Sequence, residues 1–287
     1  MQSQDHPKLE VELQRARPFL KWAGGKGQLL HELKTRLPVK FEQYHEPFLG
    51  GGALFFHLMP TKAYLSDINP DLINTYQIVK NKLHELIEDL QHHIHEKGYF
   101  YKIRGIDRTT HFKKWTDVQK ASRFIYLNKT CFNGLHRVNS RGQFNVPFGD
   151  YKNPTIADEI NLGRCSIALQ KAAVCCKDYH AVLDQAQKSD LVYFDPPYVP
   201  VSTTSNFTGY SKNGFRTEDQ EALRDLCIAL DKKGVYWMLS NSSTPLILDL
   251  YKDFRLSSIE ASRVINSKGT LRGRISEVIV TNYDYQE

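Results

Sequence analysis

The chain has 287 residues, 41% hydrophobic and 24% charged, a composition that allows a buried core and excludes disordered and collagen-like classes. Its net charge of +6 favours an anionic partner without identifying one. Residues 1–17 lack a signal-peptide core and no later segment has about 18 uninterrupted apolar residues, so we expect a soluble cytoplasmic protein with no membrane contact.

Short apolar runs that end in acidic or small polar residues recur along the chain and predict buried strands. They cover residues 44–48, 63–67, 191–195, 235–240 and 277–283. Residues 219–230 carry the spacing of an amphipathic helix between two of them. Repeated strand-helix units predict an α/β fold with a largely parallel sheet.

The middle of the chain has a different pattern. Residues 83–94 and 118–125 repeat apolar side chains at helical spacing. Residues 128–151, rich in Asn, Gly, Arg and aromatic side chains, predict an ordered loop or hairpin that makes contacts. We infer an inserted, mainly helical module at residues 70–158. The remaining core then comprises residues 1–69 and 159–287.

A loop at residues 18–27 combines an aromatic side chain, two lysines and glycines. It superficially resembles a phosphate-binding loop, but Lys26 is followed by Gly27 where that motif requires Ser or Thr, which argues against nucleotide triphosphate hydrolysis. Lys21 and Lys26 remain candidates to bind a cofactor carboxylate or a phosphate backbone.

Two further segments are typical of a cofactor site. The glycine-rich loop at residues 46–53 allows close backbone approach to a ligand, although its spacing is not that of a dinucleotide site and a structural turn is the alternative. Asp67 ends the next predicted strand, where an acid commonly receives ribose hydroxyls. Its alternative role is to cap a helix that begins near Pro70.

The sharpest motif is Asp195-Pro196-Pro197-Tyr198, directly after a predicted strand. The prolines remove two backbone donors, so carbonyl oxygens and the Asp195 carboxylate are left as acceptors for an amino group, and Tyr198 is able to stack on an aromatic amine. A plain Pro-Pro turn with a capping Asp is the alternative.

Metal ligands are not evident in the sequence. The five cysteines include the adjacent pair Cys175 and Cys176 but no CxxC or zinc-finger spacing, so we expect reduced thiols. His92, His93 and His95 have no acidic or thiol partners at ligand spacing. We therefore expect them to form a solvated helix face rather than a metal site.

Taken in order, these segments resemble the Dam-type, D12-like DNA N6-adenine methyltransferases over residues 17–283. The shared motifs are F-L-K-W-A-G-G-K, E-P-F-x-G-x-G, D-I-N and D-P-P-Y. The similarity extends through residues 133–135, 141–149 and 206–210. So many ordered matches are more specific than any single motif.

The resemblance implies a Rossmann-like S-adenosylmethionine-dependent core in which residues 70–158 form a target-recognition domain. The implied cofactor site consists of Trp22, Lys26, Phe48, Gly50, Gly52, Asp67 and Asp195. Asp195, Pro196 and Tyr198 would hold an adenine flipped out of the duplex. No metal is implied.

The resemblance also implies contacts to double-stranded DNA, with adenine methylated on both strands of GATC. The side chains nearest the base pairs would be Lys21, Phe132, Asn133, Leu135 and Arg137, and Arg141 would also bind DNA. The fork of Arg137 matches the two acceptors of guanine. Phe132 stands where relatives often have Tyr, so stacking is retained without a hydroxyl contact. We expect a monomer associated with the nucleoid.

Basic side chains in residues 262–274 favour a loop that contacts the DNA backbone, with a solvated charged turn as the alternative. They are Arg263, Lys268, Arg272 and Arg274. Two other functions are kept open for the whole chain: methylation of RNA or a protein amide, and non-catalytic DNA binding.

Overall fold

A computed structural model of the protein describes residues 15–199, 215–262 and 274–285. Its strands form one sheet in the order β3-β2-β1-β4-β5-β7-β6. They are β1 (Tyr44–Glu46), β2 (Ala63–Asp67), β3 (Ala172–Cys176), β4 (Leu191–Phe194), β5 (Tyr236–Ser242), β6 (Arg255–Ser262) and β7 (Arg274–Thr281). Neighbours from β3 to β5 are parallel, and β7 is antiparallel to β5 and β6. The predicted α/β fold is confirmed, whereas β3, β6 and the reversal of β7 were not predicted.

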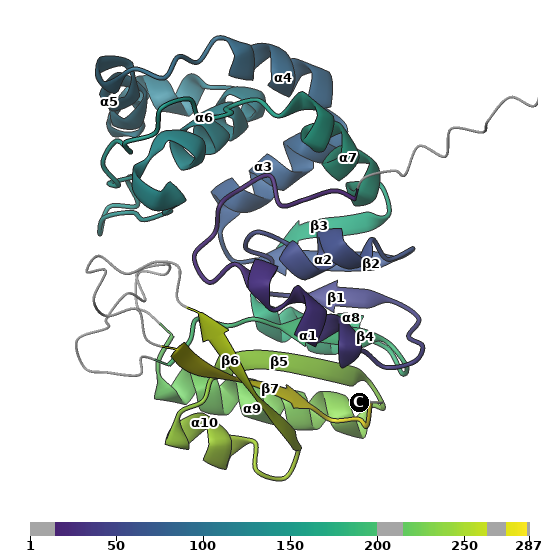
Figure 1. The fold of residues 1–287 in the computed structure, drawn as a ribbon. Helices are drawn as coiled ribbons and strands as arrows, with labels where there is room; N and C mark the ends of the chain where they lie inside the picture. Colours follow the sequence, from purple (N-terminus) through teal and green to yellow (C-terminus); the bar gives the residue numbers. More distant parts are fainter. Residues whose placement is uncertain (1–14, 200–214, 263–273, 286–287) are drawn as a thin grey trace, which may run out of the picture.

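The helices are α1 (Leu30–Thr35), α2 (Ala53–Leu58), α3 (Pro70–Asn81), α4 (Leu83–Gln91), α5 (Lys97–Gly105), α6 (Asp117–Thr130), α7 (Glu159–Leu169), α8 (Val182–Gln185), α9 (Thr217–Lys232) and α10 (Pro245–Leu250). Figure 1 shows α4, α5 and α6 grouped at one end of the molecule, beyond α3, with α9 and α10 at the other end. The helical patterns at residues 83–94, 118–125 and 219–230 are confirmed as α4, α6 and α9.

Side chains alternate between the two faces of the sheet, as β4 shows. Leu191 and Tyr193 belong to the apolar cluster that includes α2 and α3, whereas Val192 and Phe194 belong to the cluster that includes α9. Successive strand residues point to opposite faces, and both faces here are covered. Because neither face of the sheet is open to a ligand, we expect the binding site at the carboxyl ends of the parallel strands.

Local sequence sets where the helices beside the site begin. Asn69 caps α3, its side chain accepting from the backbone N–H groups of Asp71 and Leu72. Thr116 and Gln119 form a reciprocal capping box at the start of α6. Helix α3 packs against β2 and β3 and also against α4 and α6, which joins the inserted helices to the sheet.

The predicted solvated histidine face is wrong for His95, whose ring hydrogen-bonds to the Tyr151 carbonyl at 2.9 Å and stacks on Phe148. It is also wrong for His93. Its ring hydrogen-bonds to Tyr99 and Ser122 and stacks on Tyr126 with centroids 4.4 Å apart. Burial lowers the pKa of His93 to about 4, so the ring is neutral near pH 7. His93 follows the end of α4, and its ring is a core group because it packs on Ser122 and Tyr126 of α6.

Two general expectations concern cysteines and membranes. All five cysteines have free thiols, as predicted. Within residues 15–199, 215–262 and 274–285, no helix is long and apolar enough to cross a bilayer.

Candidate functional site

A cavity of about 860 Å³ lies at the carboxyl ends of β1, β2 and β4, where open α/β sheets bind their ligands. This volume falls within the range of small-molecule and cofactor sites. Most of the predicted site residues lie on its wall: Lys21, Trp22, Lys26, Phe48, Gly50, Gly52, Asp67, Asn133, Leu135, Asp195, Pro196 and Tyr198. The fold thus brings together segments that are far apart in the sequence.

An ion pair between Asp195 and Lys26 lies in this wall. Lys26 Nζ is 2.7 Å from Asp195 Oδ1, and the lysine side chain is only 5% exposed. Its ammonium also donates to the Gly24 carbonyl and lies 4.7 Å from the centroid of the Tyr198 ring. Burial raises the pKa of Asp195, whereas Lys26 lowers it. Lys26 therefore favours the ionised carboxylate, which keeps lone pairs for a further donor.

The backbone after Asp195 is held by side chains from α9 and β5 that were not identified from the sequence. Gln220 donates to the Pro197 carbonyl at 3.1 Å, and Asn241 donates to Gln220 at 3.1 Å. Gln220 therefore uses one lone pair of the Pro197 oxygen, and the Asp195 carboxylate and the Pro196 carbonyl remain predicted acceptors for an incoming amine. No described helix begins at Asp195, so the alternative role as a helix cap is not observed.

Tyr198 is oriented by β7, a contact that was also not foreseen. Its hydroxyl donates to Glu277 Oε2 at 2.8 Å. The hydroxyl end of the ring is thereby fixed, which favours one orientation of the aromatic face.

The glycine loop is held against Asp67 and Trp22. Gly50 has φ +46°, donates its N–H to Asp67 Oδ2 at 3.0 Å, and would place a Cβ 2.7 Å from Trp22 Cδ1. Gly52 also lies in the left-handed region, with φ +63°. Asp67 does not cap α3, because Asn69 does. The alternative of Asp67 as a helix cap is therefore wrong, and its carboxylate instead orders the loop.

Glu46 is a further acid in the cavity wall, besides Asp195 and Asp67. It is 2% exposed and accepts a hydrogen bond from the Tyr44 hydroxyl at 2.8 Å. Burial raises the pKa of Glu46 to about 8, and nearby Asp195 adds to the shift. Near pH 7 the wall therefore holds the Asp195–Lys26 pair beside a mainly neutral carboxylic acid.

Asp178, Tyr179 and Phe215 also line the cavity and were not identified from the sequence. Tyr179 stacks on Phe48 with centroids 5.1 Å apart, and Phe215 meets Phe48 edge to face at 5.9 Å. Only Lys177 separates Asp178 and Tyr179 from the end of β3, so recognition of that strand would have placed an acid and an aromatic near its carboxyl end.

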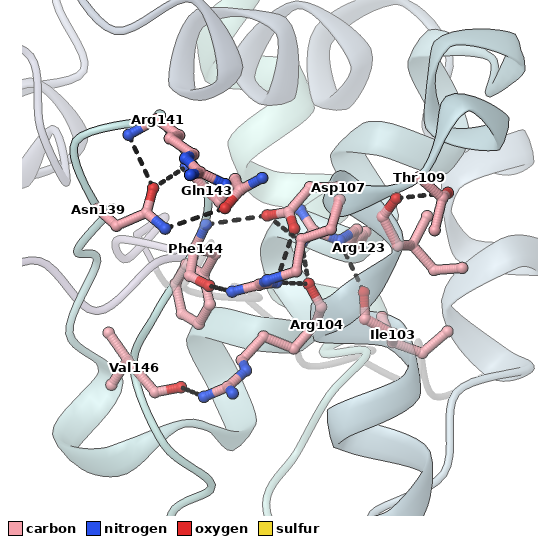
Figure 2. Close-up of polar contacts among 12 residues, drawn as sticks. Ile103, Arg104, Asp107, Thr109, Arg123, Asn139, Arg141, Gln143, Phe144 and Val146 are labelled. Atoms are coloured by element: carbon pink, nitrogen blue, oxygen red, sulfur yellow. Dashed lines mark hydrogen bonds and ion pairs between the residues drawn. The ribbon is translucent and has the colours of Figure 1, made fainter.

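The predicted loop or hairpin at residues 128–151 contains paired backbone, with Cys131 opposite Phe148 and Val138 opposite Phe144. Figure 2 shows how it is fixed to the inserted helices. The Asp107 carboxylate accepts from the Phe144 N–H at 2.9 Å and from Arg123 at 2.8 Å.

The outer surface of this hairpin carries the remaining predicted DNA-binding side chains. Phe132 is 48% exposed, and Arg141 is exposed near the turn. Arg137 is exposed and donates from Nε to Asn145 Oδ1 at 2.7 Å, which orients the guanidinium. These three side chains do not line the cavity, although Phe132 directly precedes Asn133, which does.

Some predicted residues lie outside the described part of the chain. They are Asn206, Phe207, Thr208 and Tyr210 of the family resemblance and Arg263, Lys268 and Arg272 of the basic segment.

A mainly parallel seven-stranded sheet with a reversed β7 carries a glycine loop after β1, an acid at the end of β2 and Asp-Pro-Pro-Tyr after β4. Together they define a Rossmann-like methyltransferase. The family model described as D12 class N6 adenine-specific DNA methyltransferase matches residues 22–265. The chain belongs to this family.

Individual relatives are similar over nearly their whole length. The chain is 48% identical to a Type II methyltransferase of Lactococcus lactis subsp. cremoris, M1.LlaDCHI, over 93% of the chain and 95% of the relative. It is 42% identical to a Type II methyltransferase of Methanocaldococcus jannaschii, M.MjaIII, over 93% and 99%. It is 36% identical to the DNA adenine methylase of Escherichia coli K12, over 93% and 95%.

Proposed function

We propose that this protein transfers a methyl group from S-adenosylmethionine to N6 of an adenine flipped out of duplex DNA, in the sequence GATC. The observation that carries the proposal is the Asp195–Lys26 pair, held in the wall of a cofactor-sized cavity at the strand ends. We further propose residues 70–158 as the target-recognition domain of a monomeric, cytoplasmic enzyme.

The chemistry explains why an acid and a carbonyl are needed together. The lone pair of an exocyclic adenine nitrogen is delocalised into the ring, so the nitrogen is a poor nucleophile. Acceptors for both N–H groups, here Asp195 and the Pro196 carbonyl, favour a pyramidal nitrogen and stabilise the charge that develops on it. The ion pair with Lys26 keeps Asp195 ionised for this role.

The cavity wall has groups suited to the proposed cofactor. Asp67 offers a carboxylate for ribose hydroxyls, Gly50 and Gly52 permit close backbone approach, and Phe48 presents an aromatic surface. When bound, S-adenosylmethionine supplies an electrophilic methyl group, so these residues need only place and orient the reactants.

The hairpin supports the DNA side of the proposal. Adenine N6 is paired inside a duplex, so the base has to leave the stack to reach the cavity. Exposed Phe132 is suited to fill the space the base leaves, and Tyr198 to stack on the base inside. GATC itself follows from the family resemblance.

Methylation-sensitive sequencing of DNA from cells that express this chain tests the proposed function. We expect N6-methyladenine in GATC on both strands, and none in cells that express an Asp195→Ala variant. Methyladenine confined to another sequence would overturn the site assignment alone. Methylated RNA or protein with unmethylated DNA would overturn the substrate assignment, and cofactor binding without any methyl transfer would favour a non-catalytic DNA-binding protein.

Asp67→Ala is expected to weaken cofactor binding about tenfold or more, because hydrogen bonds to a charged group contribute about 1.5–3 kcal/mol. The variant also frees the Gly50 N–H that orders the glycine loop. Calorimetric titration with S-adenosylhomocysteine measures the loss, and DNA affinity should change far less. Asp249→Ala, which removes an exposed acid on α10, is the control. Equal affinities in Asp67→Ala and wild type would leave Asp67 with a structural role only.

Lys26→Met is expected to shift the acid limb of the pH profile of kcat/KM to higher pH. Asp195 acts as an acceptor when ionised, so activity rises as the pH passes its pKa. Burial already raises that pKa and Lys26 lowers it, so removing the ammonium raises it further. An unchanged acid limb in the folded variant would show that Lys26 does not control the ionisation of Asp195.

A further inference from the structure

One buried amide joins the cofactor cavity to the recognition hairpin. Asn128, on α6, is 2% exposed. Its side-chain oxygen accepts from the Lys21 N–H at 2.8 Å, and its side-chain nitrogen donates to the carbonyls of Lys21 at 2.7 Å and Gly134 at 2.9 Å. The oxygen and both N–H groups of the amide are therefore hydrogen-bonded. Their partners, Lys21 and Gly134, belong to two segments that are far apart in the sequence.

A stack of rings makes a second connection between the same segments. Trp22 is nearly parallel to His136, with centroids 5.5 Å apart, and His136 is stacked on Phe124 at 4.9 Å. Burial lowers the pKa of His136 to about 4, so a neutral ring lies in this stack near pH 7. Gly134, at φ +63°, packs so closely on Lys21 that any side chain there would collide with it.

The two connected segments both contribute to the cavity wall, but each also extends to a different part of the molecule. Trp22 contacts the glycine loop at Gly50, and Lys26 of the same N-terminal segment pairs with Asp195. Gly134 and His136 flank Leu135 and lead directly into Arg137 on the hairpin. A shift of the hairpin toward DNA must therefore carry the N-terminal segment with it or break buried hydrogen bonds, which is costly when polar groups lose their partners.

We propose that Asn128 is a positioning residue that couples the recognition hairpin to the cofactor cavity, so that DNA binding and cofactor binding favour each other. The inference rests on the proposed function, since it needs both ligands to bind. The coupling is reciprocal: whatever factor DNA gains from the cofactor, the cofactor gains from DNA.

The experiment is calorimetric titration of S-adenosylhomocysteine into the full chain, alone and saturated with a GATC duplex. For wild type we expect binding about fivefold or more tighter with the duplex, the lower end of typical coupling factors. The coupling is expressed as the Kd without the duplex divided by the Kd with it. For Asn128→Ala we expect this ratio to fall to within about twofold of one. A merely structural role would weaken both affinities and leave this ratio unchanged.

Asn161 provides a matched control. It is 4% exposed and makes the same kind of amide link to the N-terminal segment, accepting from the Arg17 N–H and donating to the Arg17 carbonyl, both at 2.9 Å. Asn161 lies on α7, and these amide bonds do not involve Gly134 or His136, so Asn161→Ala should keep the wild-type ratio. If Asn128→Ala fails to fold, His136→Leu removes the ring stack instead and should lower the ratio in the same direction.

The outcomes separate this inference from the proposed function. A wild-type chain that binds no S-adenosylhomocysteine overturns both. A wild-type chain that binds both ligands with a ratio of Kd values near one overturns the coupling alone. A folded Asn128→Ala variant that keeps the wild-type ratio also overturns it. If His136→Leu is used in place of Asn128→Ala, the same result for that variant has the same meaning.

Discussion

Asp195→Ala is expected to lower kcat about 100- to 1000-fold, the cost of removing one preorganised electrostatic partner from a reacting group. The lost carboxylate is the acceptor proposed for the adenine amino group and the partner of buried Lys26. Single-turnover methylation of a GATC duplex measures the effect without interference from product release.

DNA binding should survive this change, because Asp195 is not one of the proposed DNA-binding side chains, most of which lie on the hairpin at residues 128–151. The variant should therefore bind a GATC duplex with nearly wild-type affinity, and its thermal unfolding should remain cooperative. Asp249→Ala again serves as the charge-matched control. A folded Asp195→Ala enzyme that keeps more than a tenth of wild-type turnover would contradict the assigned role.

Arg137→Ala is expected to relax sequence choice by about 1–3 kcal/mol at one guanine, or roughly 5- to 150-fold in the ratio of rates. A guanidinium fork matches the O6 and N7 acceptors that guanine presents in the major groove. The bond from Arg137 to Asn145 already orients this fork, which lowers the entropy lost on binding. The measurement is kcat/KM on GATC divided by kcat/KM on duplexes with one outer base pair substituted.

Arg141→Ala is the matched control, since Arg141 is an exposed arginine on the same hairpin. If it contacts only the DNA backbone, its loss weakens all duplexes about equally and leaves the ratio unchanged. If the ratio of kcat/KM values is also unchanged in Arg137→Ala, Arg137 contacts only the DNA backbone. A wild-type enzyme that ignores GATC would overturn the assigned site while leaving the role of Asp195 intact.

The strands that the sequence predicted are those that carry a strong local pattern. Residues 63–67 and 191–194 are mostly apolar and mostly buried; the first strand has the predicted bounds, and the second ends one residue before the predicted end. Strands β3 and β6 form the two edges of the sheet, and their sequences, AAVCC and RLSSIEAS, are short or polar. An edge strand has a partner on one side only, so its sequence needs less apolar character and gives a weaker signal.

The direction of β7 could not be predicted for a different reason. Alternation of apolar and polar side chains has the same period in parallel and antiparallel strands, so it predicts a strand without its orientation. The order of the strands and the connections between them decide that orientation, and both are properties of the whole sheet.

The candidate site likewise has residues that the sequence identified and contacts that only the tertiary structure showed. The sequence by itself identified Asp195, Lys26, the glycine loop and Asp67 as candidate site residues, because each lies in a short motif whose residue types and spacing suit the proposed chemistry. Only the tertiary structure showed that Glu277 fixes Tyr198, that Gln220 occupies the Pro197 carbonyl, and that Asn128 joins Lys21 to Gly134. It also turned His93 from an expected surface residue into a core residue. Such contacts join residues tens of positions apart, and packing selects them; a local pattern reports only which face of its own helix or strand is apolar.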